Sequence, residues 1–177
     1  MVNPYASYFT TGTVFVTCFT AHDEAVLTSE ATCRLFRETL RQVKQRVPFT
    51  MNAFTLLPEH AHLMIRPEQA DQLDEIVGAT LGRFNKEYQS LLGQPGKGLT
   101  WSRTYQQIVM HNVETFAAHL DYIHYDAVRH NLADRPEEWL QCSYEAWVER
   151  GIYKLGWGWQ EPESIKLVNV KKIEGKK

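Results

Sequence analysis

Residues 49–66 constrain the fold of this 177-residue chain more than any other stretch. Two strand-like apolar runs, 49–57 and 60–66, are separated only by Pro58 and Glu59. A connection this short joins antiparallel neighbours, because parallel strands need a crossover of about a dozen residues or more. The sequence therefore predicts an antiparallel β-hairpin in the first half of the chain.

Helical patterns flank this hairpin on both sides. Before it, apolar side chains recur at spacings of four, three and four, which predicts a helix over 29–47. After it, a second apolar stripe predicts a helix that is capped by Asp71 and ends near Gly93. Strand-like runs at 13–20 and 104–110 complete the order βαββαβ. We therefore expect an α+β fold with a ferredoxin-like antiparallel sheet.

The remainder of the chain adds elements at the C-terminal side. A third predicted helix begins after Asn112, a favourable N-cap, and runs to about Val128. Residues 136–159 are rich in aromatic residues and glycine without a steady period, which predicts a short helix and irregular chain. We expect a single domain over residues 1–160 and a basic, mobile tail over 161–177, which holds five lysines.

Charge and composition limit the function classes. The formal net charge is −2, and proteins that neutralise many phosphates are usually basic, so bulk charge gives nucleic-acid binding no support. No apolar run approaches the roughly 20 residues of a membrane span, and the first residues lack a signal-peptide pattern, so we expect a cytoplasmic protein without a membrane partner. Cys18, Cys33 and Cys142 form no Cys-x-x-Cys pair and are expected to be reduced.

Two histidines stand one residue apart in the second strand of the predicted hairpin. Side chains alternate along a strand, so His60 and His62 share one face while Ala61 and Leu63 face a core. Imidazole is the commonest protein metal ligand, and a rigid strand holding two of them provides half of a metal site. The alternative is a pair of half-exposed histidines without a ligand role.

The third predicted helix carries residues that can complete such a site. Tyr122 and Asp126 are four residues apart and therefore lie on the same flank, one turn from each other. Asp126 offers an oxygen ligand, and a divalent cation held by two imidazoles and a carboxylate can polarise a phosphodiester. The Tyr122 oxygen could then attack in line and form a covalent phosphotyrosine. The alternative is that residues 122–125 only form an aromatic-rich packed helix.

Several blocks of the sequence are similar to one known family. Residues 57–63, Leu-Pro-Glu-His-Ala-His-Leu, resemble the Leu-Pro-Asp-His-hydrophobic-His-Leu signature of the HUH single-tyrosine transposases, and specifically of REP-associated tyrosine transposases. Blocks at 101–105, 119–130 and 139–158 follow that family's later blocks in the same order. The resemblance spans nearly the whole chain up to Trp159.

The resemblance implies a metal-dependent endonuclease and strand transferase that acts on single-stranded or hairpin-forming repeat DNA through a 5′-phosphotyrosine. By position, His60 and His62 correspond to metal ligands, Tyr122 on the added helix to the nucleophile, and Asp126 to the family's third ligand, an Asn. The implied ion is Mg²⁺ or Mn²⁺, although two imidazoles would also accept zinc. Relatives occur as monomers and as homodimers, and the sequence does not decide between them.

The chain departs from the family pattern at several positions. Ala61 is small for the position between the histidines and is expected to pack less firmly. Asp126 and Ala127 replace Asn-Pro, which makes the third ligand anionic and lets the helix continue. Gln107 stands where relatives often have Glu, and residues 130–131 replace His-Gly with His-Asn, where Asn still tolerates a left-handed helix end.

Basic and aromatic residues are candidates for DNA contact, although an aromatic residue at such positions is more often part of a core. They are Arg34, Arg37 and Arg41 in the first helix, Arg66 after the histidines, Arg83 and Lys86 in the second helix, and Trp101, Arg103 and Tyr105 in or just before the last strand. Two alternatives to the transposase-like enzyme remain open: a domesticated protein that binds DNA hairpins without cutting them, and a phosphoesterase with water as the nucleophile.

Overall fold

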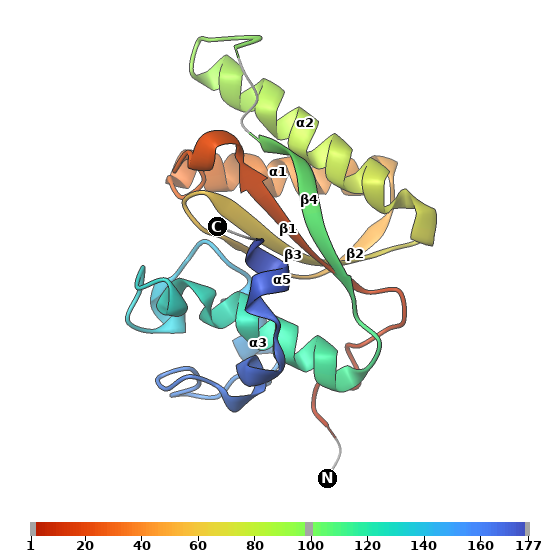
Figure 1. Ribbon diagram of the computed structural model, residues 1–177, viewed down its shortest axis with the longest axis vertical. Helices are drawn as coiled ribbons and strands as arrows, with labels where there is room; N and C mark the ends of the chain where they lie inside the picture. The colour runs from red at the N-terminus through yellow and green to blue at the C-terminus, as the bar shows by residue number, and fades with distance from the viewer. Residues whose placement is uncertain (1–2, 98–100, 176–177) are drawn as a thin grey trace.

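The computed structural model describes residues 3–97 and 101–175, and it has a four-stranded antiparallel sheet with helices on both faces (Figure 1). The strands are β1 (Val14–Thr20), β2 (Phe49–Leu56), β3 (His60–Pro67) and β4 (Trp101–Val109), in the order β2-β3-β1-β4. The long helices are α1 (Glu30–Arg46), α2 (Leu73–Leu91) and α3 (Val113–Arg129), and the short ones are α4 (Tyr144–Glu149) and α5 (Val170–Glu174). The predicted α+β fold with a βαββαβ order and an added helix is confirmed.

The sheet separates two apolar cores, because successive side chains of a strand point to opposite faces. Helices α1 and α2 cover one face, where they bury Ala61, Leu63 and Ile65 of β3. Helix α3 and the chain after it cover the other face and bury Phe15 and Met64. The histidines of β3 face this second core. Ala61 is fully buried between the sheet and helices α1 and α2, and how firmly it packs stays a prediction.

The predicted hairpin forms, and its register places Thr55 opposite His62. Strand β4 begins at Trp101 and not at residue 104, because an irregularity in its pairing with β1 lets Trp101 lie opposite Thr20. The predicted cap at Asp71 is also wrong. Asp71 lies inside a short 3-10 turn, Ala70–Gln72, where the side chain of Gln72 accepts a hydrogen bond from the backbone N–H of Gln69, and α2 begins only after this turn.

The predicted boundaries of α3 agree with the structure. The Asn112 side chain caps the helix by accepting a hydrogen bond from the backbone N–H of Thr115 at 2.8 Å. The helix continues past Ala127 to Arg129, as expected without the proline found in relatives. Asn131 has a left-handed backbone, with φ of 57°, which is consistent with its predicted place after the helix end.

The C-terminal segment differs from the predicted mobile tail. Residues 163–174 form a 3-10 turn and α5, and Ile165, Val168 and Ile173 are buried in the core on the α3 side. The lysines of this stretch point outward, while its apolar side chains pack into the core. Its lysine content alone therefore does not indicate a mobile tail. As a result α5 lies beside β4 and close to α3 (Figure 1). None of the described helices is long and apolar enough to cross a membrane.

Candidate active site

His60 and His62 project from β3 toward α3, and both are buried. Their rings lie 4.8 Å apart between centroids, as alternation along the strand predicts. The Nδ1 atom of His62 is hydrogen-bonded at 2.9 Å to the hydroxyl of Thr17, which lies opposite it on β1. The Nδ1 atom of His60 lies 3.3 Å from a carboxylate oxygen of Glu59. These contacts fix both rings and direct their Nε2 atoms toward α3.

The Asp126 carboxylate of α3 faces the Nε2 atoms of His60 and His62. Its Oδ2 atom lies 3.1 Å from Nε2 of His62 and 3.6 Å from Nε2 of His60. These three buried atoms have no hydrogen-bond partner within the part of the chain that the structure describes. Buried polar atoms are rarely left unpaired in proteins, and the two nitrogens and one oxygen are the donor types that bind divalent cations. The residues therefore fit a metal ion.

The protonation states of His62 and Asp126 favour a ligand role, whereas that of His60 depends on the nearby carboxylates. Burial lowers the pKa of His62 to about 4, so its ring is neutral near pH 7. Burial alone would raise the pKa of Asp126, but the facing imidazoles and the Arg129 guanidinium hold that pKa well below its usual value. For His60, the carboxylates of Asp126 and Glu59 outweigh the effect of burial and raise its pKa. A neutral imidazole and an ionised carboxylate are the forms that bind metal.

Tyr122 lies one turn before Asp126 on the same helix, and its side chain is fully buried. Its hydroxyl donates a hydrogen bond to Oε1 of Glu174 at 3.0 Å and accepts one from Nη2 of Arg129 at 2.9 Å. The Arg129 guanidinium also lies 5.1 Å from the centre of the Tyr122 ring. Burial and the nearby Asp126 raise the pKa of Tyr122, while Arg129 opposes this shift. The phenol is therefore neutral near pH 7.

Three site residues were not predicted from the sequence: Arg129, His130 and Glu174. The Nε2 atom of His130 lies 3.7 Å from Oδ1 of Asp126, and its ring centre lies 5.3 Å from that of His60. Glu174, on α5, forms an ion pair with Arg129 as well as its contact with Tyr122. The four-residue spacing from Asp126 to His130 was a usable signal. Nothing in the sequence indicated Glu174, which is an acidic residue in a lysine-rich segment.

The predicted DNA-contact residues do not gather at this site. Arg34, Arg37 and Arg41 lie on α1, and Arg83 and Lys86 lie on α2, which cover the opposite face of the sheet. Arg41 pairs with Glu38, and the Arg37 guanidinium donates to the carbonyl oxygen of Leu140 at 3.1 Å. Arg66 reaches the hydroxyl of Thr50 across the hairpin.

The aromatic predictions on β4 are corrected in one case. Trp101 is only 4% exposed and packs between Phe36 and Phe84, so it cannot stack on a base in this fold. Tyr105 is half-buried, and its hydroxyl is hydrogen-bonded to Asp74 of α2. Arg103 is exposed on the same strand and stays a candidate for DNA contact.

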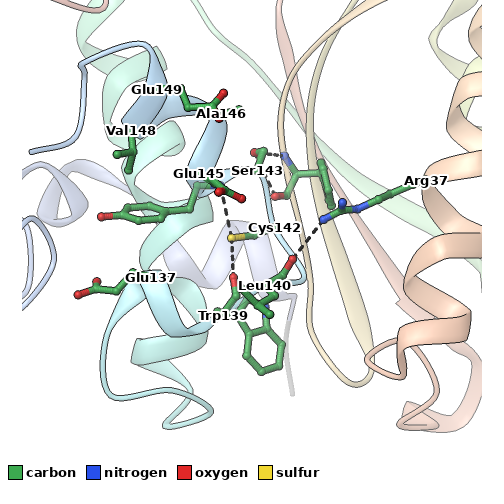
Figure 2. A pocket seen from close by; sticks show the side chains of 12 residues that line it. Arg37, Glu137, Trp139, Leu140, Cys142, Ser143, Glu145, Ala146, Val148 and Glu149 are labelled. Carbon is green, nitrogen blue, oxygen red and sulfur yellow. Dashed lines mark hydrogen bonds between the residues drawn. The ribbon is translucent and has the colours of Figure 1, made fainter.

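A large surface hollow of about 730 Å³ lies elsewhere, between α1 and residues 137–149 (Figure 2). Arg37 reaches into it from α1, and Ser143 closes one side by its hydrogen bonds to the backbone of Phe54. None of the candidate metal ligands described above, nor the candidate nucleophile Tyr122, lines it. A smaller hollow of about 420 Å³ borders Glu174 and therefore adjoins the candidate active site.

Comparison with known proteins agrees with this geometry. The family model "Transposase IS200 like" matches residues 11–126, which is more than half of the chain and includes His60, His62, Tyr122 and Asp126. The chain belongs to the IS200-like transposase family. His130 and Glu174 lie beyond the matched part of this IS200-like transposase.

The predicted resemblance to REP-associated tyrosine transposases is confirmed by two curated relatives. A putative REP-associated tyrosine transposase of Haemophilus influenzae is 27% identical over 139 residues, covering 74% of this chain and 79% of the relative. The REP-associated tyrosine transposase of Escherichia coli is 25% identical over 125 residues, covering 70% of this chain and 72% of the relative.

A solved structure is also similar to this IS200-like transposase. It is a REP-associated tyrosine transposase bound to a REP hairpin, with a TM-score of 0.72 and 24% identity. The similarity covers 93% of this chain and 96% of the solved one. The elements that hold the candidate site, β3 and α3, therefore belong to a shared fold.

Proposed function

We propose that this transposase is a metal-dependent nuclease and strand transferase that cuts single-stranded DNA next to a hairpin through a covalent 5′-phosphotyrosine on Tyr122. One observation carries the proposal. Tyr122 lies one helical turn from Asp126, whose buried Oδ2 faces His60 and His62 at 3.6 and 3.1 Å without a hydrogen-bond partner among the described residues. A nucleophile and a cation site side by side suit phosphodiester transfer.

His60, His62 and Asp126 would hold the metal ion, with Mg²⁺ or Mn²⁺ as the proposed species. When bound, the ion would neutralise charge on the phosphate oxygens and make the phosphorus more open to attack. The protein would hold the ligands of this ion in place, because Thr17 and Glu59 contact the Nδ1 atoms of His62 and His60 and so orient both imidazoles. The ionised Asp126 adds a negative charge that attracts a cation more strongly than an amide would.

Tyr122 performs the chemical step. Its oxygen forms a bond to the phosphorus, the bond to the 3′-oxygen breaks, and the leaving 3′-oxygen gains the proton that the phenol loses, directly or through water. Arg129 donates to the same oxygen and would stabilise the developing negative charge. Because the phosphotyrosine conserves the energy of the broken bond, a second 3′-hydroxyl can reverse the reaction and join a new strand.

Access to Tyr122 requires a rearrangement. Its side chain is fully buried, and Glu174 of α5 occupies both its hydroxyl and the Arg129 guanidinium. A phosphate would carry the same charge as this carboxylate and would have to replace it. α5 is only five residues long, so it can be displaced at lower cost than β3 or α3.

Hairpin DNA is the proposed partner, on the basis of the family and the solved relative that is bound to a REP hairpin. The alternative of hairpin binding without cleavage is supported by the same burial of Tyr122, which keeps the nucleophile from solvent. The two functions differ in whether a covalent adduct forms.

The test uses a labelled single-stranded hairpin oligonucleotide with Mn²⁺ or Mg²⁺. We expect a covalent protein–DNA adduct with wild-type protein and none with Tyr122→Phe, while both bind the hairpin. Tyr125→Phe removes a hydroxyl from the same helix and is the matched control, which should form the adduct.

Two results would contradict the proposal. Hairpin binding without an adduct under any metal would support the binding protein. Cleavage that survives Tyr122→Phe and is lost in His60→Ala would support water as the nucleophile.

A further inference from the structure

His130 is placed where it can reach the proposed metal ion. It follows the last residue of α3 and lies four residues after Asp126, so both side chains are on the same flank of the helix. The imidazole is about one quarter exposed, at the outer rim of the buried cluster formed by His60, His62 and Asp126.

The distances place His130 next to the proposed metal ligands. Single ligand atoms from His60, Asp126 and His130 all lie within 4.8 Å of one another. Two atoms that each bind the same ion at about 2.1 Å stand roughly 3 to 4 Å apart. The Nε2 atom of His130 lies 3.7 Å from Oδ1 of Asp126, and Nε2 of His60 lies 3.6 Å from Oδ2, so the two imidazoles approach the two oxygens of one carboxylate.

The Nε2 atom of His130 has two polar contacts that call for opposite tautomers. Nη2 of Arg129 lies 2.8 Å from it and Oε1 of Glu174 lies 3.1 Å from it. A guanidinium can only donate and a carboxylate can only accept, so Nε2 offers a lone pair to Arg129 when the proton is on Nδ1, and a proton to Glu174 when it is on Nε2. The same lone pair is the one that an imidazole offers to a metal ion. Coordination would replace the contacts of Nε2 with Arg129 and with Glu174, which lies 3.1 Å away.

We propose that His130 is a fourth protein ligand of the metal ion, together with His60, His62 and Asp126. This inference rests on the metal site of the proposed function. A set of three imidazoles and one carboxylate suits Mn²⁺, Co²⁺ or Zn²⁺ better than Mg²⁺, which prefers oxygen ligands. About two positions of an octahedral ion stay open for phosphate oxygens.

The experiment counts the coordinated imidazoles without using catalytic activity. Co²⁺ is added to the full-length protein in the absence of DNA, and proton NMR records the hyperfine-shifted ring protons of each histidine bound to the ion. Wild-type protein should show three sets of these signals, and His130→Ala should show two. Its dissociation constant for Co²⁺ should rise at least tenfold, on the scale of known changes around metal sites.

His111→Ala is the matched control, because His111 is exposed near the opposite end of α3, roughly 25 Å away by the helical rise. It should keep all three sets of signals and the wild-type affinity. Far-ultraviolet circular dichroism of the metal-free variants shows whether each is folded.

Two outcomes would overturn the inference in different ways. Two sets of signals in both wild-type protein and His130→Ala would remove His130 from the ligand set and leave the metal site of the proposed function standing. Weak Co²⁺ binding that His60→Ala does not change would remove the metal site itself, and the fourth ligand with it.

Discussion

The two halves of the candidate site are held in different ways. The histidine half lies on β3, in the middle of the sheet, where strand register and the hydroxyl of Thr17 fix the rings. The tyrosine half, Tyr122 and Arg129, depends on α5, a five-residue helix. Its Glu174 carboxylate accepts a hydrogen bond from Tyr122 and forms an ion pair with Arg129. The proposed cation site is therefore preformed, whereas the proposed nucleophile, Tyr122, would have to exchange a hydrogen-bond partner before it could act. Mutations can break either half separately.

Removing the carboxylate of Asp126 should have the largest effect. Asp126→Ala leaves His60 and His62 without the oxygen that faces them, so we expect adduct formation to fall by about 10²- to 10³-fold. Asp126→Asn restores a ligand oxygen of the kind that relatives carry and should keep activity within about tenfold of wild type. The rates are measured with the labelled hairpin and Mn²⁺.

Asp134→Ala is the control, since Asp134 is exposed beyond the end of α3. Equal rates for Asp126→Ala and wild type would exclude Asp126 from the cation site.

The histidine half should also make stability depend on pH. Burial lowers the pKa of His62 from 6.5 to about 4. It also lowers the pKa of His124, a buried histidine of α3 outside this half, to about 3. Between pH 6.5 and 4 the unfolded chain therefore binds more protons than the folded chain. The free energy of unfolding falls as pH falls over this interval. The raised pKa of His60 has the opposite sign and offsets part of this loss.

We expect a net decrease on the order of a few kcal/mol between pH 7 and pH 4.5. Urea denaturation followed by circular dichroism in metal-free buffer measures it. A free energy of unfolding that stays constant or rises over this interval would mean that the imidazoles are not buried as described.

A change in packing at Ala61, between the two histidines, should have a smaller effect on stability. Ala61 is fully buried against the α1 and α2 side of the sheet, so Ala61→Val adds two methyl groups to a buried position. We expect a loss of about 1–3 kcal/mol in the free energy of unfolding, measured by urea denaturation. A gain in stability would indicate free space at this position and a less rigid strand.

A mutation in the tyrosine half should raise the rate of adduct formation, in contrast to the loss expected for Asp126→Ala. Glu174→Ala removes the carboxylate that occupies Tyr122 and Arg129, and a charge-assisted hydrogen bond of this kind is worth about 1.5 kcal/mol or more. Adduct formation should therefore become roughly tenfold faster. Glu163→Ala, which removes an exposed carboxylate paired with Lys166 and distant from Tyr122 in the sequence, is the control. An unchanged or lower rate in Glu174→Ala would show that Glu174 does not restrict Tyr122.

The sequence predicted the parts of the site that depend on local geometry. Alternation along β3 is enough to place His60 and His62 on one face, and helical spacing is enough to align Tyr122 with Asp126. That β3 and α3 face each other was implied only by the family resemblance, and the structure shows it in the 3.1 Å contact of His62 with Asp126. The same spacing rule also relates Asp126 to His130, although the sequence pattern around His130 indicated only the end of a helix.

The remaining features depend on contacts between distant segments. Trp101 has the same aromatic character whether it faces DNA or a core, and only the packing of α1 and α2 decides between them. The position of Glu174 depends on the irregular path of residues 130–169, which has no periodicity to interpret. Lysines around Ile165, Val168 and Ile173 concealed the apolar anchors of this segment.

Mass spectrometry of the covalent adduct tests the central claim most directly. Wild-type protein is incubated with the hairpin oligonucleotide and Mn²⁺, digested with protease and nuclease, and searched for a peptide that carries a nucleotide. We predict a 5′-phosphate linkage on Tyr122 that is absent when the metal is removed by a chelator. A nucleotide on another residue, or cleaved DNA without any nucleotide-bearing peptide, would contradict the assignment of Tyr122 as the nucleophile.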